Sequence, residues 1–316
     1  MGRCTIYLLL ILIALSIVTC KQKEKESTSK AVAVDATFFI QENLLSPITI
    51  EEVKLSGGTT TNCYKIEVRS EPGEHTMGPW CPRHIEDGKE KGGIWFEDGK
   101  VYDVDGHFIA NIAEFYADAK WKLYNEDGSI RVTTTQEACE GAAKPNVEEA
   151  YKNHCVECMP SYYKDKITTY YIPVSPIYSE KKKNPGRGEP LGLAFNGVNF
   201  DPPAPTHAIL AAHTVAPLDD CGGHVNPHGG YHYHAATGCT KKITQEDAHA
   251  SMIGYALDGF GIFELLDTNG KEPTDLDTCH GHEDEVRGYH YHAGTPGGNQ
   301  IIGCFHGETG NMVVSP

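Results

Sequence analysis

Hydrophobic residues form one long run near the N-terminus and are spread over short segments elsewhere. The run covers residues 5–18, follows Arg3, and ends two residues before Cys20. Residues 21–30, which come next, are all polar. A membrane-spanning helix needs about 20 apolar residues, so this shorter run predicts a secretory signal peptide, residues 1–19.

The rest of the chain alternates short β-prone segments with turn residues. Residues 167–174 are rich in β-branched and aromatic side chains and predict a strand. Short helices are predicted within residues 110–124 and 244–251. Residues 92–135 predict a β-meander, because they contain three dipeptides that supply the positive φ angles of tight hairpins, namely Asp98-Gly99, Asp105-Gly106 and Asp127-Gly128.

These segments predict a mainly β fold. The chain has 33 glycines and 18 prolines, which leave little room for long helices. We expect a single large sandwich-like or irregular barrel domain over residues 46–316, with long loops, disulfides and few short helices. Residues 20–45 would form a tether between the signal peptide and this domain.

The net charge argues against a nucleic-acid-binding protein, and the end of the apolar run indicates a lipoprotein. The formal net charge is −16 and becomes −17 when residues 1–19 are removed, so the surface repels polyanions and nucleic acid is excluded as a partner. A cysteine directly after the apolar run resembles the lipobox of bacterial lipoproteins. Cys20 is therefore predicted to be lipidated and to hold the protein on a membrane; the alternative is an ordinary secretory signal with an incidental cysteine.

Export changes the interpretation of the cysteines, because oxidising compartments favour disulfides. Nine of the 11 cysteines remain without Cys4 and Cys20. The pairs nearest in sequence are Cys63 with Cys81, Cys221 with Cys239, and Cys279 with Cys304. The other three, Cys139, Cys155 and Cys158, would supply a fourth pair and one odd thiol. After export, a disulfide is favoured over a redox or zinc site in the C-x-x-C sequence of residues 155–158.

A motif that could carry chemistry occurs twice, 58 residues apart. Leu-Asp-x-Cys-x-Gly-His at residues 218–224 aligns with residues 276–282, and Tyr-His-Tyr-His at residues 231–234 aligns with residues 289–292 without a gap. A further cysteine closes each copy, so the units cover residues 218–239 and 276–304.

Strand geometry explains the alternation of tyrosine and histidine. Residues two apart on a strand share a face and lie about 6.5 to 7 Å apart, so both histidines face one side while the tyrosines pack behind them. Two such imidazoles can converge on one ion, and the histidine after the glycine can supply a third ligand. The predicted ligands of a transition metal, zinc or copper, are His224, His232, His234, His282, His290 and His292.

Other interpretations of these histidines stay open. They could be structural residues that form hydrogen bonds through their ring nitrogens. If they do bind metal, each unit could hold its own ion or the two could form a binuclear centre. Three histidines that are not duplicated, His228, His280 and His306, are expected at the surface or in supporting positions.

The same residues resemble the YHYH domain family of exported bacterial proteins. Residues 249–263 resemble the segment that links the two motifs in that family, residues 302–307 its closing segment, and residues 191–198 its first strand. Residues 91–159 look like an insertion. The resemblance draws attention to His249 as a further ligand and to Asp258, which could orient a ligand histidine, act as a catalytic base, or only cap a turn.

The family resemblance brings no assigned reaction. The sequence has neither a G-x-S-x-G serine elbow nor an H-E-x-x-H helix, so a hydrolytic or oxidative activity would depend on an open coordination position of the metal. We expect an exported, membrane-anchored metal-binding protein at the bacterial outer membrane or cell surface. A non-catalytic scaffold for binding or adhesion and a protein that captures metal for uptake are the alternatives. The sequence identifies no small-molecule or protein partner.

Overall fold

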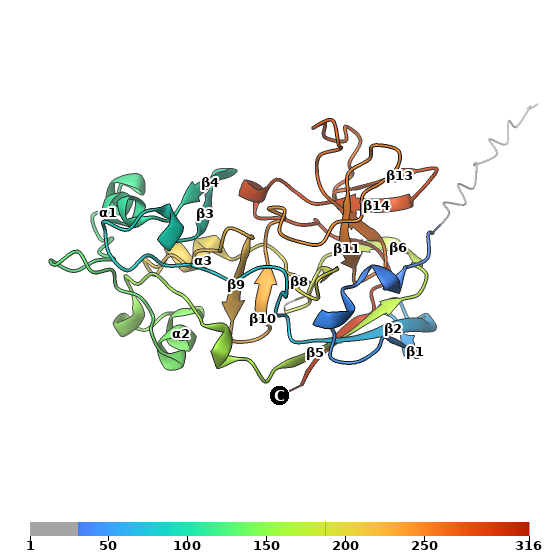
Figure 1. Cartoon of the computed structure of the whole chain (residues 1–316), viewed down its shortest axis with the longest axis horizontal. Coiled ribbons are helices and arrows are strands. Elements are labelled where there is room, and N and C mark those ends of the chain that lie inside the picture. The colour runs from blue at the N-terminus through green and yellow to red at the C-terminus, as the bar shows by residue number, and fades with distance from the viewer. Residues whose placement is uncertain (1–30, 187, 316) are drawn as a thin grey trace, which may run out of the picture.

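The computed structural model describes residues 31–186 and 188–315, and strands dominate it (Figure 1). The predicted signal peptide, residues 1–19, and the predicted lipidation site, Cys20, lie outside the described residues. Within the part of the chain that is described, no helix is long and apolar enough to cross a membrane.

The largest sheet has eight strands and contains both copies of the motif. Its strand order is β13-β14-β12-β11-β7-β8-β10-β9. In this order the strands cover Gly281–Asp284, Gly288–His292, Gly261–Phe263, Met252–Ala256, Gly192–Ala194, Asn199–Phe200, Gly230–Tyr233 and Gly223–Asn226.

Two halves of this sheet are related by an approximate two-fold axis. The central strands β7 and β11 are antiparallel, with Leu193 opposite Tyr255. On either side follow a short strand (β8 or β12), a strand parallel to it (β10 or β14), and an antiparallel edge strand (β9 or β13). The duplication therefore extends beyond the motif to four strands on each side. From here on, the first unit includes β7 to β10 and the second unit includes β11 to β14.

The other sheets are smaller. A four-stranded antiparallel sheet has the order β1-β2-β5-β16, and two further pairs are β15-β6 and β3-β4. Their strands are Thr49–Lys54, Thr60–Val68, Ile167–Pro173 and Asn311–Ser315, then Phe305–Gly307 with Tyr178–Lys183, and Ile94–Glu97 with Lys100–Asp103. None of the sheets formed by the described residues closes into a barrel, while the predicted mainly β class is confirmed.

The helices of the described part are short. The α-helices are α1 (Gly106–Phe115), α2 (Gln136–Ala142) and α3 (Thr206–Leu210). The 3-10 helices, η1 to η6, cover Ala36–Phe38, Gln41–Asn43, Lys89–Lys91, Glu149–Tyr151, Pro160–Tyr162 and Pro296–Gly298.

Two local predictions are wrong. Residues 92–135 contain the β3-β4 hairpin but not a meander, because Asp105 accepts a hydrogen bond from the Phe108 amide and so caps α1. Residues 244–251 form no helix. They connect Ile243 and Met252, which pair as an isolated antiparallel bridge, and this short span is a loop.

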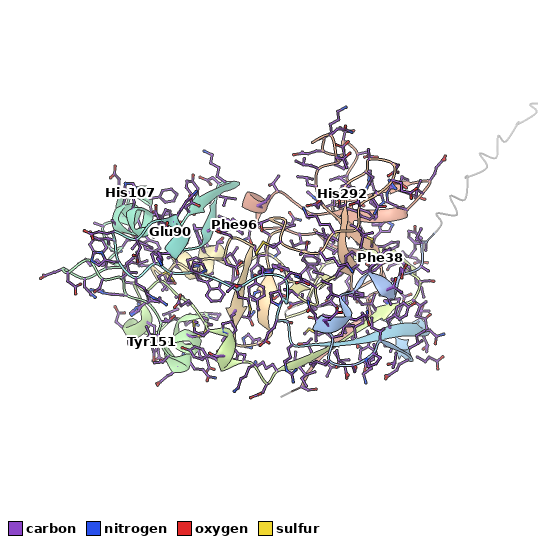
Figure 2. All side chains as sticks on the ribbon, in the orientation of Figure 1. Phe38, Glu90, Phe96, His107, Tyr151 and His292 are labelled. Atoms are coloured by element: carbon purple, nitrogen blue, oxygen red, sulfur yellow. A yellow bond between two sulfur atoms is a disulfide. The ribbon has the colours of Figure 1, made fainter. Side chains whose placement is uncertain are left out.

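The described residues form two main hydrophobic cores and a small third cluster of Ile94, Phe96, Leu218 and Ala235. The larger one packs the eight-stranded sheet against the four-stranded sheet. The smaller one lies mainly in the predicted insertion and includes Trp95, Ile109, Trp121 and Leu123. Figure 2 shows the two parts side by side, with His107 and Tyr151 at the end of the molecule away from His292.

Four disulfides connect the described residues. The structure contains the predicted pairs Cys221–Cys239 and Cys279–Cys304, whereas the predicted pair of Cys63 with Cys81 is wrong. Cys63 is a buried free thiol on β2 of the four-stranded sheet, while Cys81 belongs to the smaller core. The remaining bonds are Cys81–Cys155 and Cys139–Cys158, so the two cysteines of the C-x-x-C sequence have different partners.

Candidate metal centres

The first unit brings three predicted ligands together, and we call this group the three-histidine cluster (His224, His232 and His234). His224 on β9 lies directly opposite His232 on β10, and His234 follows one residue beyond the end of β10. The His234 Nε2 atom lies 3.0 Å from the Nε2 of His232 and 3.2 Å from that of His224. The strand register thus creates the cluster.

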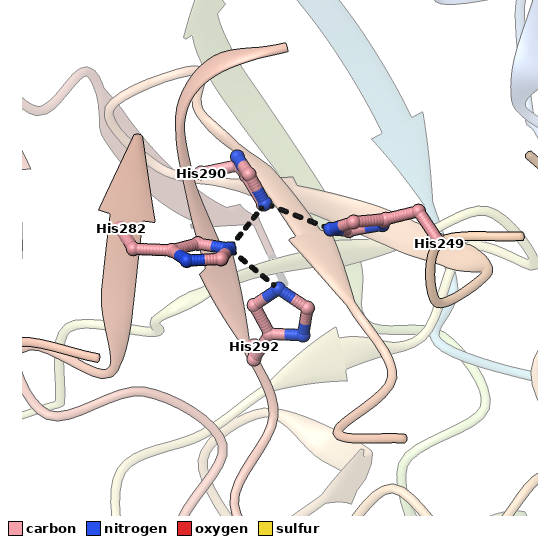
Figure 3. Close-up of side chains that lie close together, drawn as sticks. All are labelled: His249, His282, His290 and His292. Carbon is pink, nitrogen blue, oxygen red and sulfur yellow. Dashed lines mark hydrogen bonds between the residues drawn. The ribbon is translucent and has the colours of Figure 1, made fainter. Parts of the chain in front are cut away.

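The second unit repeats the arrangement and adds one ligand. His282 on β13 lies opposite His290 on β14, and their Nε2 atoms are 3.0 Å apart (Figure 3). The Nε2 of His292 lies 3.2 Å from that of His282, and the Nε2 of His249 lies 3.1 Å from that of His290. His249 enters from the loop before β11. We call this group the four-histidine cluster (His249, His282, His290 and His292).

Residues of the motif that are not histidine hold the two hairpins in shape. Asp219 Oδ1 accepts hydrogen bonds from the amides of Cys221 and Gly223, at 3.1 and 3.0 Å, and the Tyr231 hydroxyl donates to Asp219 Oδ2 at 2.8 Å. A Cβ atom at Gly223 would lie 2.5 Å from the Tyr231 ring, so only glycine fits there. The second unit repeats these contacts with Asp277, Cys279, Gly281 and Tyr289.

In each of the seven cluster histidines, the ring nitrogen that faces away from the cluster donates a hydrogen bond to an oxygen atom. Carbonyl and carboxylate oxygens only accept, so each Nδ1 carries the proton and each Nε2 presents a lone pair to the cluster. His224 donates to the backbone of Ala216. In the same cluster, Nδ1 of His232 donates to Gly230 O and that of His234 to Pro202 O. In the four-histidine cluster, Nδ1 donates from His249 to Ala250 O, from His282 to Asp275 Oδ1, from His290 to Gly288 O, and from His292 to Glu264 O.

This tautomer suits metal coordination. Neighbouring Nε2 atoms lie 3.0 to 3.2 Å apart, and their lone pairs repel each other. Nitrogens at about 2.0 to 2.1 Å from a tetrahedral ion are about 3.3 to 3.4 Å apart. The possible ligand atoms of each cluster all lie within 4.8 Å of one another, so small side-chain movements would convert either cluster into a ligand set. Both groups could hold a metal ion.

Burial keeps several of these rings neutral. It lowers the pKa of His290 to about 4 and that of His292 to about 3. It also holds the pKa of His224 and that of His234 well below the ordinary value, and that of His249 below it. These histidines are therefore available as ligands at neutral pH without the loss of a proton.

The environments of the clusters differ at one position. In the first unit the Asp201 Oδ2 atom lies 3.7 Å from the His232 Nε2. The equivalent residue in the second unit is Phe263, whose ring packs against the rings of His249 and His290. Sequence reasoning did not identify Asp201, because the second copy has no carboxylate at that position.

Cavities adjoin both clusters. The one beside the three-histidine cluster has a volume of about 500 Å³ and is lined largely by proline, alanine, valine and isoleucine. The one beside the four-histidine cluster has a volume of about 470 Å³ and a lining rich in charged residues, among them Asp247, Asp267, Lys271, Glu272 and Arg287.

The clusters are far apart. Four strands separate β10 from β14 in the sheet, which corresponds to five strand spacings or about 24 Å. The ions of a binuclear centre are about 3.5 to 4 Å apart. The binuclear alternative is therefore wrong, and the units form two separate sites.

Asp258 lies on the tyrosine side of the sheet. Its Oδ2 atom accepts a hydrogen bond from the Tyr291 hydroxyl at 2.6 Å and from the Gly307 amide at 3.0 Å. In the first unit Asn196 occupies the same place and bonds the Tyr233 hydroxyl at 3.0 Å. These contacts favour the role of a turn cap over that of a catalytic base.

The histidines that are not duplicated stay outside the clusters. His228 lines the cavity of the first unit. His280 Nδ1 donates to the carbonyl of His292 at 3.2 Å, and the His306 ring stacks on Tyr289 at 3.9 Å.

One segment of the chain is similar to a known protein family. Residues 169–274 match the model of the family described as YHYH protein, which confirms the resemblance. The matched segment contains the strands β7 to β12 of the eight-stranded sheet and ends before the second copy of the motif, which begins at residue 276. No curated protein and no solved structure matches the chain.

Proposed function

We propose that this chain, a YHYH protein by the match of its residues 169–274, binds one transition-metal ion at each histidine cluster. The observation that supports the proposal is the orientation of seven imidazoles, whose Nε2 atoms converge at 3.0 to 3.2 Å within each cluster. Neutral imidazole nitrogens are ligands that zinc and copper accept.

The oxygen acceptors on Nδ1 support the metal function over a structural one. Histidines that bind metal usually donate their second ring N–H to a carbonyl or carboxylate, and this contact fixes the orientation of the ring. A structural role would leave buried lone pairs facing each other, which is unfavourable without a cation between them.

The two ions would have different roles. Four nitrogens complete a tetrahedral shell, as in structural sites, whereas three leave one position free, as in catalytic sites. The three-histidine cluster also borders the more apolar cavity. Hydrolytic or oxidative chemistry is therefore favoured at this cluster, and the four-histidine cluster would stabilise the fold.

Metal content tests the proposal. Untagged wild-type protein should contain about two equivalents of zinc or copper by elemental analysis. His232→Ala and His290→Ala should each contain about one, because each removes a donor from one cluster only. His228→Ala is the matched control and should keep two. Protein without stoichiometric metal, or a loss of both ions in one single variant, would contradict it.

Export and membrane anchoring form part of the same proposal. Four disulfides support an oxidising compartment outside the cytosol. Acylation of Cys20 would hold the protein at the bacterial outer membrane or cell surface. Labelled fatty acid should be incorporated into wild-type protein but not into Cys20→Ala, and a Cys20→Ala protein that stays in the membrane fraction would exclude the anchor.

A further inference from the structure

We infer that the cavity beside the three-histidine cluster binds a small, mainly apolar and uncharged organic molecule that offers one nitrogen or oxygen donor to the metal. The inference rests on the proposed function, since the donor needs an ion to bind. It adds the chemical class of the ligand, the residues that select it, and the restriction to one of the two sites.

The size and lining of the cavity indicate an organic ligand. Its volume of about 500 Å³ falls in the range of about 300 to 1,000 Å³ that is typical of small-molecule sites. Apolar side chains from distant segments enclose it, among them Trp80, Val147, Val156, Ala208 and Val225. An apolar body would displace water from this surface and gain free energy in proportion to the area buried.

The charges around the cavity favour an uncharged ligand. Glu157 is paired with Arg83, Glu189 with Lys183, and Lys144 with Glu148. These acidic and basic groups therefore already have partners of opposite sign.

Asp201 is the acidic side chain beside the histidines. Its carboxylate accepts a hydrogen bond from the amide of Asn199, and it lies 3.7 Å from the His232 Nε2. An anionic ligand at the metal would approach this carboxylate and be repelled by it.

The four-histidine cluster does not have these properties. Its fourth nitrogen, from His249, occupies the position that a ligand would need. Its cavity is also lined by unlike charges rather than by apolar side chains. The organic molecule should therefore bind at one site per chain.

The wall that selects the ligand comes partly from the predicted insertion. One side of the cavity is lined by residues 142–145, Val147 and residues 156–158, which include the last residue of α2. They lie outside the segment that matches the family, residues 169–274. The repeat thus supplies the proposed metal ligands and one part of the apolar wall, such as Val225, and the predicted insertion supplies another part.

Cobalt substitution makes the open position visible. The full chain is loaded with Co²⁺, and its visible absorption is followed during titration with imidazole, 4-phenylimidazole and imidazole-4-acetate. All three offer a ring nitrogen, but the second adds an apolar body and the third adds a negative charge. We expect 4-phenylimidazole to bind about tenfold or more tightly than imidazole, imidazole-4-acetate to bind more weakly, and the change to saturate at one equivalent.

A pair of matched variants on one helix tests the wall. Ala208 of α3 is exposed and lines the cavity, whereas Ala211, the C-cap of the same helix, is exposed outside it. Ala208→Trp should fill part of the cavity and weaken 4-phenylimidazole binding about tenfold or more, while Ala211→Trp should leave it unchanged. Both variants should keep two cobalt ions, which shows that they are folded.

The possible failures are distinguishable. Protein without stoichiometric cobalt would overturn the proposed metal function itself. Protein with two cobalt ions that binds the three probes equally well, or whose 4-phenylimidazole affinity is the same in Ala208→Trp and wild type, would leave the metal sites in place and overturn the apolar ligand site.

Discussion

Individual residues show which positions of the two units serve the fold and which serve the clusters. Asn196 and Asp258 are equivalent, and each contacts the hydroxyl of a buried tyrosine on the side of the sheet away from the histidines. Because one unit uses an amide here, the position does not need an ionisable group. Asp201 and His249, by contrast, have no equivalent of their own kind in the other unit. Asp201 lies beside the three-histidine cluster, and His249 belongs to the four-histidine cluster.

Asp258→Asn tests the structural role of the carboxylate. Burial raises the pKa of Asp258 to about 6 from the ordinary 3.8. A raised folded-state pKa means that its stabilising contribution is complete below pH 3.8 and is lost as the pH rises through about 6. The unfolding free energy of wild type minus that of Asp258→Asn should therefore fall between about pH 4 and pH 6, as measured by denaturant titration.

Metal content provides the control for this variant. Asp258→Asn should retain both ions, and Asp258→Ala should retain them while losing about 1 to 3 kcal/mol of stability, because several buried donors lose their acceptor. A stability difference that does not depend on pH, or a loss of metal from Asp258→Asn, would contradict the structural role.

At the scale of elements, the unit that builds each cluster is a β-hairpin. Asn226 and Asp284 begin the turns of β9-β10 and β13-β14 by accepting hydrogen bonds from amides two and three residues ahead. Gly230 and Gly288 complete these turns with positive φ angles of 76° and 61°. The turn fixes the register. The register in turn puts the histidine of the edge strand opposite the first histidine of the Tyr-His-Tyr-His segment.

Two reciprocal glycine variants test this coupling of hairpin and cluster. In Gly223→Ala the new methyl group would collide with Tyr231, move β9 away from β10, and misplace His224. Elemental analysis should show the loss of about one ion, from the three-histidine cluster. Gly281→Ala should lose the other ion for the same reason, through Tyr289. Two ions in either variant would show that the strand register does not control metal binding.

At the scale of the whole molecule, the repeat and the predicted insertion have separate main cores, and a small cluster of Ile94, Phe96, Leu218 and Ala235 connects them. The disulfide Cys81–Cys155 closes a loop of 74 residues around the smaller core. Long loops lose the most chain entropy when they are closed, so this bond should contribute strongly to the stability of the insertion. The two histidine clusters lie in the other part of the molecule.

Removing this disulfide should separate the stability of the two parts. The double variant Cys81→Ala/Cys155→Ala should lose about 2 to 5 kcal/mol of stability in thermal unfolding, yet keep both metal ions. Cys63→Ala, which removes a free thiol from the four-stranded sheet, should have a much smaller effect. Loss of metal from the double variant would mean that the insertion is needed to form the sites.

The sequence by itself determined the parts of the site that depend on local geometry. Strand periodicity separates the two histidine positions of Tyr-His-Tyr-His from its tyrosine positions, and this holds in any sheet. The 58-residue repeat and the glycine before His224 and His282 then predicted the third histidine of each cluster. These inferences needed only neighbouring residues, so the tertiary structure left them unchanged.

Only the tertiary structure decided the features that depend on distant segments. Cys81 pairs with Cys155 across 74 residues rather than with Cys63, because the sheet and the insertion pack as separate cores. His249 and Asp201 reach the clusters through strand order, which spacing does not encode. The separation of the two clusters also follows from strand order, because four strands lie between β10 and β14.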